Sequence, residues 1–114
     1  MLHEMTLFPK PYSSIASGQK TIELRLYDEK RQSIQIGDQI RFTNSEDASK
    51  STLCEVVQLH VFKSFAELYE SLPLQKCGYT SEDAVNAHPD DMLTYYSKEE
   101  QAQYGVVGIE LKRI

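Results

Sequence analysis

The sequence has no apolar run long enough for a membrane-spanning helix. Such a helix needs roughly 20 consecutive apolar residues, and no segment of this 114-residue chain approaches that length. Its first twelve residues, MLHEMTLFPKPY, contain neither the basic start nor the apolar stretch of a signal peptide. We therefore expect a cytoplasmic protein that does not act at a membrane.

Cysteine and histidine are scarce, which argues against a metal centre. The two cysteines and three histidines show none of the C-x-x-C, H-x-x-x-H or H-E-x-x-H spacings of zinc sites. Cys54 and Cys77 allow one disulfide at most, and because nothing else suggests export we expect both to be reduced. Cys54 is interpreted as a structural thiol rather than a nucleophile. No metal or other cofactor is expected.

Acidic residues are in excess, but unevenly along the chain. The formal net charge of −5 argues against non-specific adhesion to nucleic acid. Residues 1–44 nevertheless carry six basic and five acidic side chains, whereas the remainder carries six basic and twelve acidic ones. An anionic ligand would therefore bind to the N-terminal part. The acidic remainder also permits a second function, docking to a basic protein partner.

Alternating apolar residues predict five short strands, at residues 3–8, at 20–27, around Ile40 and Phe42, at 52–62 and at 104–114. Helices are predicted at 9–18, in the polar stretch before Gly37, from Ser64, in 81–87, in 89–96 and from Ser97. Residues 45–51 are predicted to form a solvated hairpin loop. The pattern favours an α+β fold, one domain over residues 1–114, with a closed or nearly closed β-barrel that leaves no exposed sheet edges.

The stretch GQKTIELR, residues 18–25, places charges inside a predicted strand. Lys20 shares the alternation of the apolar residues, so its stem is expected on the core side with its ammonium at an opening. There it could accept a proton or bind a phosphate or carbonyl oxygen. Glu23 and Arg25 share the other face and are close enough to pair. The spacing alone favours the alternative, which is a surface salt bridge beside a lysine whose stem merely covers apolar surface.

Tyrosine is frequent enough to suggest a stacking surface for bases. Together with Arg25, Arg31 and Arg41, tyrosines could form a platform for a single strand. Tyrosine is also an ordinary half-buried residue, so for any single tyrosine packing in the core or at its rim is favoured over base stacking. The candidates are Tyr27, Tyr69, Tyr79, Tyr95, Tyr96 and Tyr104.

GQKTIELR matches the G-x-K-x-x-E-x-R signature of the ASCH domain family, whose members are relatives of PUA domains. Gly18, Lys20, Glu23 and Arg25 occupy its four fixed positions. The likeness continues over nearly the whole chain, in LFPKPYSSIASG, IGDQIRF, SFAELYESL and YYSKEEQAQYGVVGIEL. The resemblance implies a PUA-like barrel of about five to six strands, with short helices flanking a cleft. The cleft would be lined by the signature residues.

The resemblance implies a protein that binds RNA or a nucleotide. The expected binding residues are Gly18, Lys20, Thr21, Glu23, Arg25 and Tyr27. Lys20 and Arg25 would contact phosphate or a base carbonyl, and Glu23 would orient Arg25 or accept from a base amino group.

An enzyme is the alternative that the resemblance leaves open. Some similar proteins are ribonucleases, and one branch hydrolyses the modified nucleoside N4-acetylcytidine. That branch has a lysine aligned with Lys20 but a threonine nucleophile where this chain has Glu23, and Thr21 lies two residues earlier. Lys20 and Glu23 would be the catalytic residues of a metal-independent amidohydrolase or ribonuclease. The branch also needs a later glutamate, for which the candidates are Glu67, Glu70 and Glu82.

Overall fold

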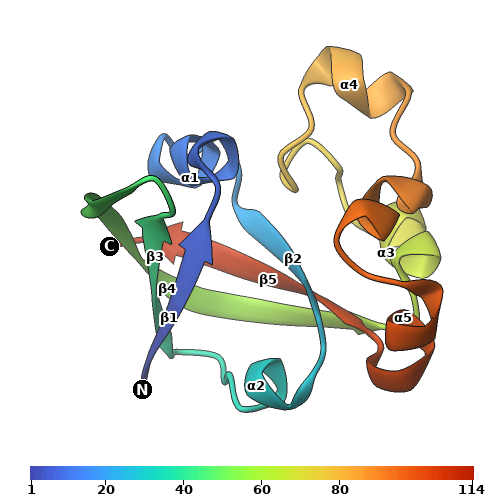
Figure 1. The fold of residues 1–114 in the computed structure, drawn as a ribbon, viewed down its shortest axis with the longest axis horizontal. Coiled ribbons are helices and arrows are strands. Elements are labelled where there is room, and N and C mark those ends of the chain that lie inside the picture. The colour runs from blue at the N-terminus through green and yellow to red at the C-terminus, as the bar shows by residue number, and fades with distance from the viewer.

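Five strands form one curled sheet in a computed structural model that describes residues 1–114 (Figure 1). The strands are β1 (Leu2–Leu7), β2 (Ile22–Leu26), β3 (Gln39–Asn44), β4 (Asp47–Phe62) and β5 (Val106–Arg113). The helices are α1 (Pro9–Ala16), α2 (Glu29–Gln32), α3 (Phe65–Ser71), α4 (Ser81–Val85), the 3₁₀ helix η1 (Pro89–Thr94) and α5 (Lys98–Tyr104). Residues 64–104, which we call the helical layer, lie on one side of the sheet (Figure 1).

The sheet is a half-barrel with strand order β1-β3-β4-β5-β2. β1 runs parallel to β3, and the other neighbouring pairs are antiparallel. The predicted α+β class and PUA-like barrel are confirmed, with five strands. The predicted closure is not seen, because β1 and β2 are the two edges and no ladder joins them. A side chain crosses this opening instead, where Arg25 Nη2 donates to the Thr6 carbonyl at 3.4 Å.

The hairpin between β3 and β4 is tighter than the sequence suggests. Residues 45–51 were expected to be a loop, but β4 begins at Asp47, so only Ser45 and Glu46 form the turn. The Asn44 side chain accepts from the Glu46 amide at 2.9 Å, and Asn44 pairs directly with Asp47. Backbone ladder bonds do not depend on side-chain polarity, so this exposed polar segment continues the strand.

The helix starts predicted from serine are confirmed. The Ser64 and Ser97 hydroxyls accept from the amides of Glu67 and Glu100, respectively. At Ser97 the capping box is complete, because Glu100 also accepts from the Ser97 amide. At the start of α3 the carboxylate of Glu67 accepts instead from the amide of Lys63.

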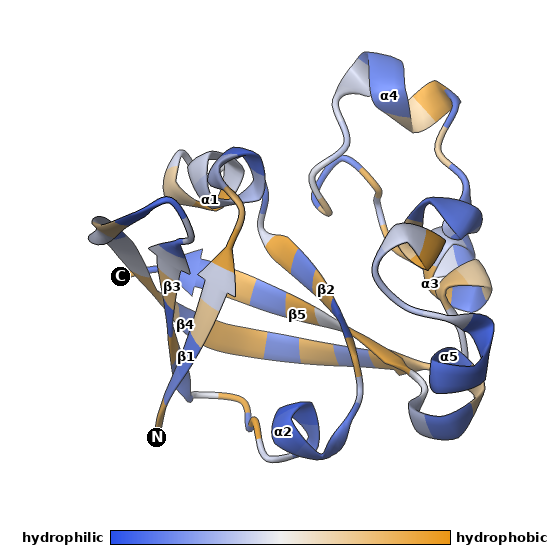
Figure 2. Cartoon of the chain, in the orientation of Figure 1, coloured by the Kyte–Doolittle hydropathy of each residue, from blue (hydrophilic) through white to orange (hydrophobic).

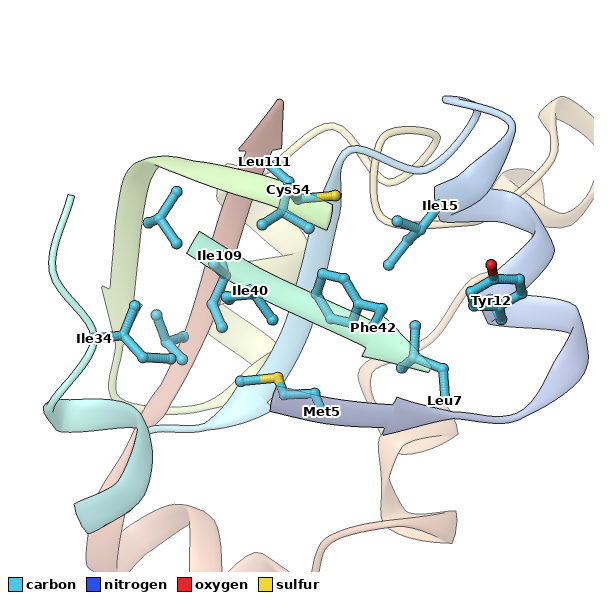
Figure 3. Close-up of a cluster of buried hydrophobic side chains, with 12 residues drawn as sticks. Met5, Leu7, Tyr12, Ile15, Ile34, Ile40, Phe42, Cys54, Ile109 and Leu111 are labelled. Atoms are coloured by element: carbon cyan, nitrogen blue, oxygen red, sulfur yellow. The ribbon is translucent and has the colours of Figure 1, made fainter. Parts of the chain in front are cut away.

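Two apolar clusters fill the two sides of the sheet. The first lies inside the half-barrel, against α1, and is shown in Figure 3. The second joins the β2 residues Ile22, Leu24 and Leu26 to Phe65 and Leu68 of α3. Figure 2 shows apolar and polar residues alternating toward the end of β5. Near the start of β5 consecutive residues are buried, because both faces of the strand are covered there. Both cysteines are free, buried thiols, with Cys54 in the first cluster and Cys77 in the second.

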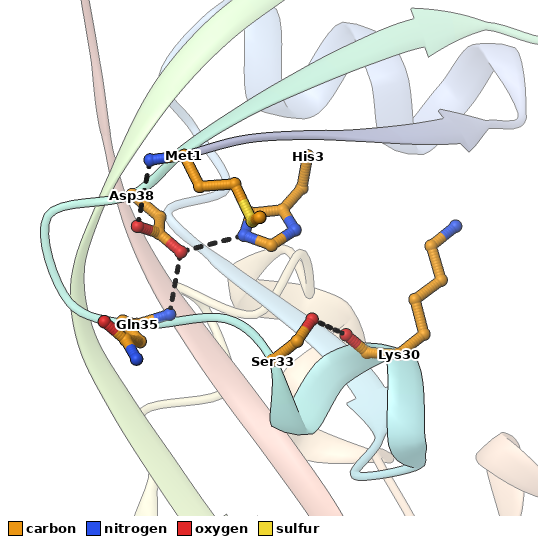
Figure 4. Close-up of polar contacts among 6 residues, drawn as sticks. All are labelled: Met1, His3, Lys30, Ser33, Gln35 and Asp38. Atoms are coloured by element: carbon orange, nitrogen blue, oxygen red, sulfur yellow. Dashed lines mark hydrogen bonds and ion pairs between the residues drawn. The ribbon is translucent and has the colours of Figure 1, made fainter.

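Asp38 ties the turn before β3 to β1 (Figure 4). Its carboxylate accepts from the Gln35 amide at 3.0 Å, lies 2.8 Å from His3 Nε2 and contacts the amino group of Met1 at 3.3 Å. The hydrogen bond with His3 and the Gln35 amide lower the pKa of Asp38 to about 2.

Replacing Asp38 by asparagine is expected to lower stability in a pH-dependent way. A carboxylate whose folded pKa is depressed stabilises the fold above its unfolded pKa of about 3.9, and this contribution is lost as the pH falls toward the folded value. Urea unfolding of both proteins should show a stability gap that is constant above about pH 5 and narrows toward about pH 2. A gap of unchanged size throughout acid titration would contradict this role of Asp38.

Candidate functional site

A cavity of about 530 Å³ opens between the half-barrel and the helical layer. Its walls come from parts of the chain that are distant in sequence: the β1–α1 junction, β2, the loop after α3 and the helix η1. This volume lies within the range of small-molecule sites in proteins. We call it the main cavity.

Three charged side chains of the signature meet in this cavity. Lys20 Nζ lies 2.7 Å from Glu23 Oε1, and Arg25 Nε donates to Glu23 Oε2 at 2.9 Å. Arg25 Nη2 is also 2.9 Å from Oε2. Glu23 is only 4% exposed, and the side chains of Lys20 and Arg25 are largely buried. The predicted pairing of Glu23 with Arg25 is confirmed, and the alternative of a surface salt bridge is wrong.

The pKa of Glu23 is set by two opposing effects. Burial raises the pKa of this carboxyl, but the charges and hydrogen bonds of Lys20 and Arg25 outweigh burial and hold the pKa below its ordinary value. Glu23 is therefore ionised at neutral pH. The three side chains together carry a formal charge of +1, in a protein whose overall charge is −5.

Lys20 reaches Glu23 because it lies outside the β2 ladder. The strand was expected to begin at residue 20, with Lys20 on the side of the apolar residues, and that expectation is wrong. β2 begins at Ile22, and the carbonyl of Lys76 accepts from the amides of both Thr21 and Ile22 at 2.9 Å. Strand alternation therefore does not govern Lys20, and its ammonium reaches the carboxylate on the opposite face.

Gly78 packs closely against the stem of Lys20. Its φ of +111° suits glycine, and a Cβ at this position would lie 3.2 Å from Lys20 Cδ. The neighbouring Cys77 also lines the main cavity. Burial raises the pKa of Cys77 to about 11 despite the nearby Lys20 charge, so this thiol is protonated at neutral pH and is a poor nucleophile.

The facing wall consists of hydrogen-bonded tyrosines and an aspartate. Tyr79 donates to Asp91 Oδ2 at 2.8 Å, and the Tyr69 hydroxyl lies 2.6 Å from the Tyr79 hydroxyl. Burial, followed by these hydrogen bonds, strongly raises the pKa of Tyr79, so the phenol stays protonated. Tyr96 also lines the cavity, and its ring stacks on Phe65, with centroids 5.9 Å apart.

Two aromatic rings are exposed at the cavity. Phe8, at the start of α1, is 64% exposed, and Tyr95, at the end of η1, is 59% exposed. Both line the main cavity. Exposed rings beside a cationic cluster are the elements of a base-stacking site.

The structure brings together only part of the predicted site. Lys20, Glu23 and Arg25 line the main cavity, whereas Tyr27 packs against the first apolar cluster. Gly18 and Thr21 line a second cavity, of about 350 Å³, which also includes Lys20. Among the tyrosines, the four that line the main cavity are Tyr69, Tyr79, Tyr95 and Tyr96.

None of the candidate glutamates, Glu67, Glu70 and Glu82, lines the main cavity. The second carboxylate there belongs to Asp91. Asp91 lies in the first turn of η1, within the helix predicted in 89–96, and completes a capping box with His88. Sequence reasoning missed its place at the cavity, as it missed Phe8, because no spacing along the chain links either residue to the signature.

No three side chains of histidine, cysteine, aspartate or glutamate are grouped so that they could hold a metal ion. None of the helices combines the length and the apolar character needed to cross a membrane.

Comparison with known protein families identifies one family. Residues 5–114 match the family model described as ASCH domain. The crystal structure of the hypothetical protein PH0355 is similar over the full length of both chains, with 34% identity and a TM-score of 0.80. The solution structure of protein PF0455 from Pyrococcus furiosus is 33% identical, with a TM-score of 0.72, over 100% of this chain and 98% of that chain.

A more distant likeness concerns the fold alone. The crystal structure of ASCH from Zymomonas mobilis has a TM-score of 0.68 at 13% identity, over 97% of this chain and 66% of that chain. No curated protein matches the chain.

Proposed function

The chain belongs to the ASCH domain family, and on this premise we propose that it binds RNA or a nucleotide in the main cavity. We propose further that residues 1–114 form one such domain and that Lys20, Glu23 and Arg25 are its central binding residues. ASCH domains are generally associated with nucleic acids, and the chemistry of this cavity fits that association.

The observation that carries the proposal is the buried cluster of Lys20, Glu23 and Arg25. Glu23 uses both carboxylate oxygens on its two partners, so its role is to orient them. One ammonium proton of Lys20 suffices for its bond to Glu23, and Arg25 bonds Glu23 through Nε and Nη2, which leaves Nη1. The remaining donors suit phosphate or base carbonyl oxygens, which accept charge-assisted hydrogen bonds.

The exposed rings supply the second half of the recognition. Phe8 and Tyr95 offer apolar faces at the cavity, where a base can stack without regard to its identity. Asp91 and the tyrosine hydroxyls lie on the same wall as Tyr95 and can bond to base edges.

The hydrolase alternative receives less support from the geometry. A displaced threonine nucleophile would have to be Thr21, which lines the second cavity instead. The glutamates considered for a second acid lie away from the main cavity, and Lys20 is already bound to Glu23. We therefore expect purified protein in chelator to release no cytidine from N4-acetylcytidine. Turnover that disappears in Lys20→Met would replace the binding proposal with an amidohydrolase.

Substitution of Lys20 by methionine tests the binding proposal. Methionine keeps an apolar stem against Gly78 while removing the ammonium. A charge-assisted hydrogen bond is worth about 1.5–3 kcal/mol, so affinity for a fluorescent single-stranded RNA should fall about 10- to 150-fold in an anisotropy titration. The charge-matched control is Lys30→Ala, an exposed lysine of α2 that does not line the cavity. It should bind as the wild type does. Equal affinities of Lys20→Met and wild type would refute the proposal.

A further inference from the structure

A second cavity lies against the first and shares Lys20 with it. It measures about 350 Å³ and is lined by eight residues, which are Ile15, Gly18, Lys20, Thr21, Cys54, Leu111, Lys112 and Arg113. We propose that it is an anion subsite that holds a further phosphate of a single-stranded oligonucleotide whose first nucleotide occupies the main cavity. The proposal rests on the proposed function of the main cavity.

The charge of the lining is the first reason. Three of its residues are cationic, Lys20, Lys112 and Arg113, and none is acidic. Acidic residues outnumber basic ones by 17 to 12 in this chain, so a cavity without any carboxylate departs from the rest of the surface. Its floor is apolar, made by Ile15, Cys54 and Leu111, and an apolar floor strengthens the attraction between a cation and a phosphate.

The second reason is the way in which Arg113 is held. Its Nη1 donates to the carbonyl of Ala16, at the end of α1, at 2.6 Å. Gly18 has a φ of +85°, and a Cβ there would lie 3.1 Å from Arg113 Nη2. The glycine of the signature therefore leaves room for the guanidinium close to the backbone. The hydrogen bond to Ala16 fixes Nη1, while Nε and Nη2 of Arg113 remain available to a ligand.

The third reason is that the two cavities meet at one shared residue. Lys20 is the one residue that lines both, and Thr21 adds a hydroxyl to the second cavity. A ligand with a single phosphate can fill only one of them. A strand of two or more nucleotides can place successive phosphates on either side of Lys20, so the geometry favours an oligonucleotide over a free mononucleotide.

The test compares a short and a long probe on the same variants. Lys112→Ala and Arg113→Gln each remove a charge from an exposed residue, so the double variant should fold. Wild type is expected to bind tetrauridylate at least 10-fold more tightly than uridine monophosphate. The double variant should lack that difference while its affinity for uridine monophosphate stays unchanged. For the double variant with tetrauridylate, the logarithm of the binding constant should also fall less steeply with the logarithm of the salt concentration. The slope should become shallower by roughly 0.7 for each phosphate that the protein no longer neutralises.

Two results would overturn the second subsite. One is equal affinity of wild type for both probes, and the other is a double variant that weakens both probes by the same factor. Lys30→Ala should change neither affinity, which separates the effect of the local cations from the effect of net charge. Failure of the proposed function would look different, because wild type would then bind neither probe.

Discussion

Glu23→Gln is expected to lower the free energy of unfolding by about 3–5 kcal/mol, which is typical for breaking a buried ion pair. The carboxylate is buried between two cations at 2.7 and 2.9 Å. An amide of the same shape leaves Lys20 and Arg25 side by side without a counter-charge, and its NH₂ group faces one of them. Small domains are stable by only about 5–15 kcal/mol, so this one substitution would remove a large part of the total.

Urea unfolding followed by circular dichroism measures this effect, and Glu4→Gln is the matched control. Glu4 also pairs with an arginine, Arg41, at 3.1 Å, but its side chain is 70% exposed. Exposed pairs contribute about 0–1 kcal/mol, so the control should unfold nearly as the wild type does. Equal costs for the two substitutions would contradict the view that burial makes the Glu23 cluster important.

The same cluster predicts a direction of pH dependence. The folded pKa of Glu23 lies below its ordinary value of about 4.3. Its ionised form therefore stabilises the fold above that pH, and the contribution is lost as the pH falls through the lowered folded pKa. The difference in the free energy of unfolding between wild type and Glu23→Gln should therefore narrow in acid. A gap that widened there would mean that Glu23 is protonated in the folded protein.

A triple substitution can separate stability from binding at this cluster. Replacing a whole buried ion network by apolar residues of similar volume is often neutral or stabilising. Lys20→Met, Glu23→Leu and Arg25→Met combined should therefore recover most of the stability that Glu23→Gln loses. RNA binding should nevertheless be lost, because no cationic donor is left in the cluster. If the triple variant had both the stability and the RNA affinity of wild type, these residues could not belong to the binding site.

Local patterns in the sequence predicted those features that depend on neighbours along the chain. Glu23 and Arg25 are two residues apart on a strand, so their pairing follows from alternation. The end of α1 follows from Gly18, which has a positive φ. The starts of α3 and α5 follow from the serine caps Ser64 and Ser97. The family signature then indicated the fold, which the five-stranded half-barrel confirms.

Features set by distant contacts could not be predicted in this way. Lys20 leaves the strand pattern because the carbonyl of Lys76 takes the amides of Thr21 and Ile22. Asp91 reaches the main cavity through the fold of the helical layer, and its hydrogen bond to Tyr79 spans twelve positions of sequence. The signature residue Gly18 and its neighbour Thr21 were assigned to the same cleft, but they line a separate cavity on the other side of Lys20.

Phe65→Ala is expected to lower the free energy of unfolding by about 3–5 kcal/mol, the usual cost of truncating a fully buried phenylalanine. Phe65 is 0% exposed and lies in the second apolar cluster, between α3 and β2. It also stacks on Tyr96, which lines the main cavity. Its removal should therefore weaken RNA binding as well as the fold, since the wall beneath the cavity loses its support.

Phe8→Ala is the matched contrast for Phe65→Ala, because Phe8 is an aromatic residue at the same cavity that is 64% exposed. Its removal should change the free energy of unfolding by less than about 0.5 kcal/mol. Base stacking on an aromatic ring is worth about 1–3 kcal/mol, so RNA affinity should fall about 5- to 150-fold. Urea unfolding and RNA titration of both variants therefore separate the ring that builds the cavity from the ring that contacts its ligand. If Phe8→Ala bound RNA as tightly as wild type, base stacking at this rim would be excluded, and an unfolding cost below about 1 kcal/mol for Phe65→Ala would contradict its role in the core.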